Sequence, residues 1–419
     1  MSALSVTDKP EDLGLSSDRL ARLAPYFEDR YVAAGRLSGV LTLVARRGQV
    51  ARLDCVGDRD AASGAPIEPD TVFRIYSMTK PITSVALMTL YEEGLFQLDD
   101  PASRFLPELA DLRVWEDGTP TSYRTTVADR EITVRDLLTH TAGFTYGFMV
   151  RHPVDALYRR AGIEGRSSLV PQEGPPAEDL AEMVARLGEL PLLFNPGSRW
   201  SYSIATDVCG HLVERLSGLP LDQFFRERLF EPLGMTDTGF SVTEEQADRM
   251  GASYVAAPAN PLLPIETATT SIFREHPSFL SGGGGLVSTA GDYLRFALML
   301  LNGGELDGQR ILGRKTVEYM TSNHLPTGGD LASMGQRVFS ETTYEGIGFG
   351  LGFSVMLDPV RAAVVGSVGE FAWGGAASTM FWVDPREELV GMLFTQLIPS
   401  SMYPLRREMK ALTYQALID

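Results

Sequence analysis

Segments with a strand pattern lie near both ends of this 419-residue chain, and they constrain its fold most strongly. Residues 39–45 and 50–56 are rich in Val and Leu on either side of a short polar turn, which predicts a hairpin. Strand patterns return near the C-terminus, at 349–357, 362–368, 376–383 and 389–395. Because hairpin-linked strands pair antiparallel, we predict a central, mainly antiparallel sheet built from both ends of the chain and flanked by helices.

The middle of the chain is helical and loop-rich. Residues 203–216 repeat apolar side chains every four positions and end before Gly218, which predicts a helix. We therefore predict an α/β (α+β) fold with two domains. Residues 1–94 and 285–419 would form the domain with the antiparallel sheet, and residues 95–284 a mainly helical inserted domain, with the functional site between them.

Composition excludes several classes of function. The net charge of -17 argues against nucleic acid and against an anionic membrane surface as partners. No apolar run approaches the roughly 18 residues that a membrane span needs, and the N-terminus shows no signal-peptide core. Cys55 and Cys209 lie in apolar segments, so we expect buried thiols and no disulfide framework. These patterns predict a cytoplasmic protein and indicate no oligomeric state.

The stretch Ile75–Ile82 places a hydroxyl and an amine at the predicted start of a helix. Pro81 is tolerated only within the first turn, so the helix has to begin near Ser77. Residues three apart share a helix face, so Lys80 can reach the Ser77 hydroxyl as a base reaches a nucleophile. The alternative is a helix-capping serine followed by a solvated lysine, and spacing alone favours that alternative.

Two further stretches could take part in chemistry. Tyr202 precedes the predicted helix 203–216, whose positive end favours a phenolate that could accept a proton. The alternative is a tyrosine packed between helices with its hydroxyl satisfied. Trp373-Gly374-Gly375 opens a predicted strand, where exposed N–H groups can bind an oxyanion. The alternative there is an edge strand with a bulge.

Other catalytic patterns are absent from the sequence. There is no G-x-S-x-G, no H-E-x-x-H and no cysteine pair at zinc spacing. The five histidines are dispersed, and we expect structural roles for them. The run Gly282–Gly285 lacks the residues of a phosphate-binding loop, so a tight turn or close backbone packing is the better interpretation.

The three motifs together, in their order along the chain, decide between the catalytic and the structural interpretations. Ser77-Met78-Thr79-Lys80, then Tyr202, then Trp373-Gly374-Gly375 resembles, in this order, the serine β-lactamase and penicillin-binding-protein superfamily. The pattern is most similar to its class C-like esterase branch, the family VIII carboxylesterases. Supporting similarities cover residues 137–143, 231–235 and 284–289. The resemblance implies a β-lactamase/transpeptidase-like fold.

The same resemblance implies roles for individual residues. Ser77 would be the acylated nucleophile, Lys80 its proton acceptor or electrostatic activator, and Tyr202 the residue that shuttles protons to the leaving group and from the deacylating water. The N–H groups of Ser77 and Ala376 would form the oxyanion hole. Trp373, Gly374 and Gly375 would bind the substrate. This chemistry needs no metal and no organic cofactor.

Two departures from the superfamily pattern point to the substrate. Ile204 stands where β-lactamases have an asparagine, and Trp373 where they have a lysine that pairs with a substrate carboxylate. Both changes favour hydrophobic, uncharged esters, so we predict a serine esterase for short to medium acyl esters. The alternatives are an acyltransferase, a β-lactamase or D-amino peptidase, and a non-catalytic binding module. We expect acyl-pocket residues near 144–149 and in the loop before Pro176.

Overall fold

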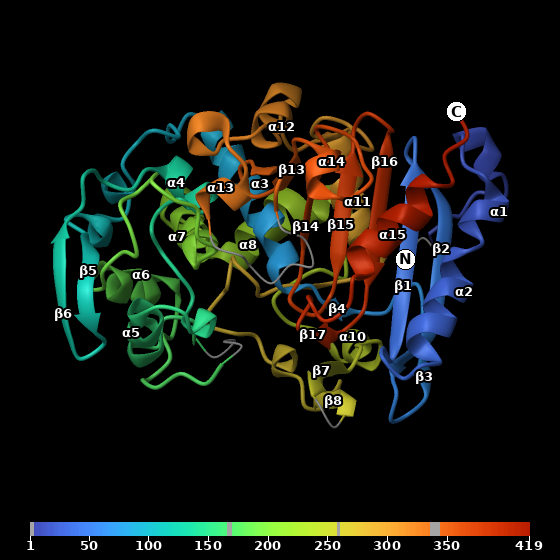
Figure 1. Ribbon diagram of the computed structural model, residues 1–419, viewed down its shortest axis with the longest axis horizontal. Coiled ribbons are helices and arrows are strands. Elements are labelled where there is room, and N and C mark those ends of the chain that lie inside the picture. The colour runs from blue at the N-terminus through green and yellow to red at the C-terminus, as the bar shows by residue number, and fades with distance from the viewer. Residues whose placement is uncertain (1–3, 166–169, 258–259, 336–343) are drawn as a thin grey trace.

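The main sheet of the molecule is antiparallel and has eight strands, and it lies in the right half of Figure 1. The computed structural model describes residues 4–165, 170–257, 260–335 and 344–419. Across the sheet the strands are β12 (Ile347–Phe349), β13 (Ser354–Met356), β14 (Phe371–Gly374), β15 (Met380–Asp384), β16 (Leu389–Phe394), β1 (Gly39–Arg46), β2 (Gln49–Asp60) and β3 (Ala65–Pro66). Strand β1 pairs with β16, so both ends of the chain build one sheet.

Strand β1 explains why the sheet is covered on both sides. All eight of its residues are buried, and their side chains alternate between two hydrophobic cores. Leu41 and Leu43 belong to the larger core, whereas Val40 and Val44 belong to the smaller one. A strand buried on both faces needs apolar residues at nearly every position, which is what the Val- and Leu-rich segment supplies. The predicted antiparallel sheet flanked by helices is therefore confirmed.

Helices cover the two faces of the sheet. The smaller core lies under α1 (Ser17–Leu20), α2 (Leu23–Phe27) and α15 (Leu405–Tyr414). The larger core contains α3 (Thr79–Glu92) and α11 (Ala290–Leu301). Every residue of α3 from Thr79 to Leu90 is buried, so this helix runs through the interior and its first turn is enclosed by protein.

The middle of the chain forms a helical region beside the sheet (Figure 1). Its helices are α4 (Val134–Leu138), α5 (Pro153–Ala161), α6 (Leu180–Gly188), α7 (Ala205–Ser217) and α8 (Leu221–Phe225). Helix α7 packs against α3, which brings the residues before α7 close to Ser77. This region also contains strands that the sequence analysis did not predict, namely the hairpins β5–β6 (Arg113–Thr119, Ser122–Val127) and β7–β8 (Ser253–Ala257, Asn260–Glu266).

Short elements complete the described chain. They are β4 (Phe73–Arg74), α9 (Glu231–Leu233), α10 (Glu244–Asp248), β9 (Val287–Ser288), β10 (Glu305–Leu306), β11 (Gln309–Arg310), α12 (Arg314–Met320), α13 (Leu331–Met334), α14 (Pro359–Ala362) and β17 (Leu397–Ile398). Among the described residues, no helix is long and apolar enough to cross a membrane.

Four predictions of local structure were wrong. Residues 349–357 are not one strand, because Gly352 takes a positive φ of 92° in the turn that separates β12 from β13. Residues 362–368 are not a strand, because Asp358 caps the N-terminus of α14 and Ala363 then takes a left-handed conformation. Trp373 lies in β14, and the next strand, β15, begins only at Met380, so the third motif closes one strand instead of opening another. Cys55 is exposed, at a position of β2 that lies outside its pairing with β3.

Candidate active site

Ser77 lies at the start of the buried helix α3, on the wall of a pocket of about 260 Å³. A 3-10 turn (Tyr76–Met78) leads directly into the helix, and Pro81 is its third residue, where the ring does not disturb the helix. Tyr76 has a φ of 43°, a left-handed conformation that is strained for a bulky residue. This turn presents the Ser77 hydroxyl to the pocket.

Lys80 lies beside Ser77 and is 2% exposed. Its Nζ is 3.3 Å from Ser77 Oγ, donates to the Gly283 carbonyl at 2.6 Å, and lies 4.5 Å from the centre of the Tyr202 ring. Burial lowers the pKa of Lys80 to about 7, although the negative charge of Asp207 acts in the opposite direction. At neutral pH a large share of Lys80 is therefore the free amine, which can accept a proton.

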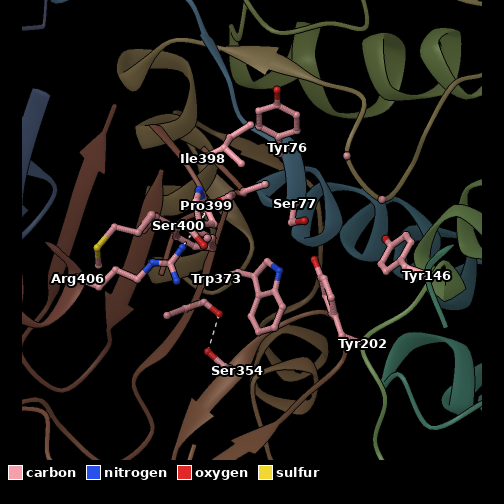
Figure 2. A pocket seen from close by; sticks show the side chains of 18 of the residues that line it. Tyr76, Ser77, Tyr146, Tyr202, Ser354, Trp373, Ile398, Pro399, Ser400 and Arg406 are labelled. Atoms are coloured by element: carbon pink, nitrogen blue, oxygen red, sulfur yellow. Dashed lines mark hydrogen bonds between the residues drawn. The ribbon is translucent and has the colours of Figure 1, made fainter. Parts of the chain in front are cut away.

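Tyr202 points towards Ser77 and Trp373 (Figure 2). Burial raises its pKa well above the ordinary value and outweighs the influence of the Ser77 and Trp373 side chains, which favour the phenolate. The expectation that the helix end makes Tyr202 a phenolate is therefore wrong. Tyr202 lies outside helix α7, before its N-cap residue Ile204, and desolvation by burial has the largest effect on the pKa of Tyr202. At neutral pH Tyr202 is a phenol, which can donate a proton.

The third motif reaches the same pocket from the sheet. Trp373, Gly374, Gly375 and Ala376 all line it, and the Trp373 and Tyr202 rings are 5.6 Å apart. A Cβ on Gly375 would lie 2.4 Å from the Ile75 carbonyl, so only glycine allows the strand to approach the turn before Ser77 this closely. The segments that carry Ser77, Tyr202 and Trp373 are distant in the sequence and thus meet at one pocket. Lys80 is buried beside Ser77.

Asp207 is a site residue that the sequence analysis missed. It is buried in the first turn of α7, where Oδ1 accepts hydrogen bonds from the Ser281 hydroxyl (2.5 Å) and the Gly283 N–H (3.0 Å). Burial raises its pKa, against the positive charge of Lys80. Because the Gly283 carbonyl in turn accepts from Lys80, Asp207 positions the turn that holds the amine. An acidic residue in the first turn of the predicted helix, five positions after Tyr202, was the available signal.

The glycine run 282–285 packs closely against this network, as expected. A Cβ on Gly282 would lie 2.9 Å from the Thr206 carbonyl, and one on Gly283 would lie 2.2 Å from Asp207 Oδ2. His140 is buried beside Tyr202, and its Nδ1 is 3.1 Å from Ser203 Oγ.

The two walls of the pocket differ in character. On one side Tyr146, Phe148 and Phe279 provide an aromatic surface. The first two fall in the predicted stretch 144–149, whereas Phe144 lies in the core and Phe279 was not predicted. Of the loop before Pro176, Glu164 lines the pocket and residues 166–169 lie outside the described residues. On the other side lie Ile398, Pro399, Ser400 and Arg406, which no sequence motif indicated.

The part of the chain that the structure describes contains no group of three or more His, Cys, Asp or Glu side chains that could hold a metal ion.

Comparisons with known proteins agree with this geometry. The Beta-lactamase family model matches residues 26–414. An uncharacterized protein of Mycobacterium tuberculosis is 38% identical over 369 residues, which cover 87% of each chain. Esterase EstB of Burkholderia gladioli is 32% identical over 396 residues, which cover 90% of each chain. The solved structure of EstCE1, described as a hydrolase with promiscuous acyltransferase activity, is 28% identical with a TM-score of 0.76 and covers 95% of this chain and 99% of its own.

Proposed function

The chain belongs to the beta-lactamase family, and within it we propose a carboxylesterase that hydrolyses short to medium acyl esters through a covalent acyl-enzyme on Ser77. One observation carries this proposal: an amine with a pKa of about 7, Lys80, lies 3.3 Å from a serine hydroxyl on the wall of a largely apolar pocket. A nucleophile next to a base of matched pKa is what acyl transfer requires.

Acylation begins with proton transfer. The free amine of Lys80 takes the Ser77 proton while Oγ attacks the ester carbonyl carbon, which forms a tetrahedral intermediate with a negatively charged oxygen. Ser77 and Ala376 both line the pocket, and their N–H groups would bind this oxyanion. One such donor is worth about 3 kcal/mol in acyl-transfer enzymes.

Tyr202 completes the first half of the reaction. Its phenol donates a proton to the leaving alkoxide as the carbon–oxygen bond breaks, and the alcohol departs. In the second half, a water molecule gives a proton to the Tyr202 phenolate and attacks the acyl carbon. The Ser77 alkoxide then leaves and recovers its proton from the Lys80 ammonium, so the enzyme returns to its starting state.

The residues around the site favour esters over lactams. Ile204 and Trp373 both line the pocket, at the positions where the resemblance places an asparagine and a lysine in β-lactamases. Without these polar groups, an anionic amide loses two of the contacts that would orient its carbonyl, whereas an ester, with its better leaving group, depends on them less.

A matched set of variants tests the proposal. Wild type should release 4-nitrophenol from 4-nitrophenyl butyrate in an initial burst. Mass spectrometry should detect a covalently attached butyryl group on wild type and none on Ser77→Ala. Tyr202→Phe should slow ethyl butyrate, a poor leaving group, more than the 4-nitrophenyl ester, by up to about 10²-fold. Tyr146→Phe is the control, because its ring also lies near Lys80, at 5.3 Å. No turnover of any ester by wild type would refute the proposal.

An acyltransferase is the second candidate. The likeness to EstCE1 favours it, because the description of that structure names both activities. The aromatic wall of Tyr146, Phe148 and Phe279 could hold an acceptor alcohol in place of water. Adding 1-hexanol to the butyrate assay separates the two functions: hexyl butyrate in excess over butyrate would establish acyl transfer as the main reaction.

We further propose that the enzyme works in the cytoplasm. Both of its cysteines, Cys55 and Cys209, are free thiols, which supports a reducing compartment.

A further inference from the structure

His140 is a buried histidine that the proposed reaction does not use. It lies two residues after the end of α4 and is 1% exposed. Its φ of 58° is left-handed, a conformation that is uncommon for a residue other than glycine and that clusters at functional sites. In this conformation both the backbone and the side chain of His140 contact the segment that carries Tyr202.

The contacts of His140 reach three successive residues of that segment. Its carbonyl accepts from the Ser201 N–H at 2.9 Å, and its ring centre lies 5.0 Å from that of Tyr202. Its Nδ1 is 3.1 Å from the hydroxyl of Ser203, which is buried as well. The same hydroxyl accepts from the N–H of Ala205, the first residue of α7. His140 therefore holds Tyr202 through its ring and through both neighbouring residues.

The imidazole ring of His140 is itself enclosed and uncharged. Its centre lies 6.0 Å from the ring centre of Trp200 and 5.5 Å from that of Phe349, so aromatic side chains surround it. Burial, and then the positive charge of Lys80, hold the pKa of His140 well below its ordinary value. The ring can therefore bond to Ser203 without adding a second cation beside Lys80.

The phenol of Tyr202 needs support of this kind. Residues 201–203 belong to no helix or strand, yet the Tyr202 hydroxyl points across the pocket towards Ser77 and Trp373 (Figure 2). A general acid has to lie within hydrogen-bond reach of the leaving oxygen, and a displacement of about 1 Å can cost about 10²-fold in rate. Contacts that fix the position of Tyr202 therefore affect the rate of proton transfer.

We propose that His140 is a positioning residue that holds the Tyr202 phenol within reach of the leaving group. The proposal rests on the proposed esterase function and deepens it. The sequence predicted structural roles for all five histidines, and the contacts of this one assign it to the proton-transfer step. His140 would act only through Tyr202, so its effect should depend on the leaving group and on the phenol.

Three variants separate the ring of His140 from its backbone. His140→Gly removes the ring, and glycine takes the same φ without strain, so the carbonyl can still accept from Ser201. His140→Asn keeps a side-chain amide that can bond to Ser203, and asparagine tolerates the left-handed conformation. The control is His211→Asn, at a buried histidine of α7 whose Nδ1 lies 3.0 Å from Glu214 Oε2. Urea unfolding shows which variants are folded, and His140→Asn carries the comparison if His140→Gly does not fold.

We would measure kcat/KM for ethyl butyrate and for 4-nitrophenyl butyrate, whose leaving group needs no proton. His140→Gly should slow the ethyl ester about tenfold more than the 4-nitrophenyl ester. His140→Asn should show a smaller difference of the same kind, and His211→Asn none. In a Tyr202→Phe background, His140→Gly should cost less than about twofold with either ester, because the phenol is already gone. Equal slowing of both esters, or an undiminished loss in the Tyr202→Phe background, would mean that His140 only supports the fold and would overturn the proposal.

Crystal structures keep this result distinct from the esterase proposal, because they need no turnover. If wild type hydrolyses no ester, the esterase proposal fails. A Tyr202 hydroxyl that lies about 1 Å or more further from Ser77 Oγ in His140→Gly than in wild type would still support the positioning role. His211→Asn should leave that hydroxyl in place. An unmoved Tyr202 side chain in His140→Gly would overturn the positioning role, whatever the activity of wild type.

Discussion

Lys80 and Lys410, two of the chain's four lysines, are both buried, and their surroundings differ in one respect. Each ammonium faces an aromatic ring, at 4.5 Å for Lys80 and 5.6 Å for Lys410. Lys410 forms an ion pair with Glu370, whereas Lys80 bonds to the neutral oxygens of Ser77 and Gly283. The positive charge of Lys410 is thus compensated by a carboxylate, whereas the groups bonded to Lys80 are neutral.

The difference shows how this fold makes a lysine basic at neutral pH. Burial alone penalises an ammonium, and without a carboxylate in contact the pKa of Lys80 falls to about 7. Asp207 is close enough to oppose this shift, but its Oδ1 is bonded to Ser281 and the Gly283 N–H. At the other lysine, Glu370 compensates the charge directly and Tyr414 donates to the same carboxylate. The surroundings of Lys80 therefore suit catalysis, and those of Lys410 suit stability.

Replacing each lysine by methionine should lower activity at one position and stability at the other. Lys80→Met removes the base while keeping the length of the side chain, so kcat/KM for 4-nitrophenyl butyrate should fall by about 10²- to 10⁴-fold. Stability should not fall. The folded-state pKa of about 7 lies below the ordinary 10.5, so the folded protein binds fewer protons between these values. Wild-type stability therefore rises with pH across that window, and the variant should lose this rise.

Lys410→Met should instead destabilise the protein. The Glu370 carboxylate, 2% exposed, would lose its cation, and breaking a buried pair in this way costs about 3–5 kcal/mol. Urea unfolding monitored by tryptophan fluorescence measures the loss. The double variant Lys410→Met/Glu370→Gln removes both charges and should recover most of it, while the amide can still accept from Tyr414. Equal stability of the single and double variants would contradict the assignment of a buried ion pair.

The pH dependence of activity should report the Lys80 amine. Below pH 7 the lysine becomes an ammonium that cannot take the Ser77 proton, so kcat/KM should fall about tenfold per pH unit from a midpoint near 7. Above it the rate should stay level past pH 10, because the raised pKa keeps Tyr202 protonated. A midpoint near 10.5 would mean that burial does not perturb Lys80.

Local patterns and a resemblance sufficed to predict much of this site. Ser77 and Lys80 are three residues apart on one helix, so their proximity follows from helix geometry alone. The antiparallel sheet followed from hairpin signals in consecutive strands. The same reasoning missed the β5–β6 hairpin, because most of its residues are polar and exposed, and the alternation of a half-buried strand is absent.

Properties that arise from packing could not be predicted. The pKa of Tyr202 depends on how completely other segments bury its side chain. The nearby helix N-terminus predicted a lowered pKa, whereas burial raises it. Arg406 reaches the third motif from more than 30 positions further along the chain, through a helix whose own pattern shows only an amphipathic surface. Roles that depend on the register between distant elements are therefore the ones that needed the structure.

Asp207 raises the pKa of Lys80 less than burial lowers it, so replacing Asp207 should have a modest effect on activity. Asp207→Asn keeps an oxygen that can accept from Ser281 and Gly283 but removes the negative charge that raises the pKa of Lys80. The acidic limb of the kcat/KM profile should therefore move to lower pH, with little change in the plateau. Asp207→Ala, which also removes the acceptor, should lower the plateau because the Gly283 turn loses its support. An unchanged limb in Asp207→Asn would mean that Asp207 is already protonated there, as its raised pKa allows, and that Lys80 is then tuned by burial alone.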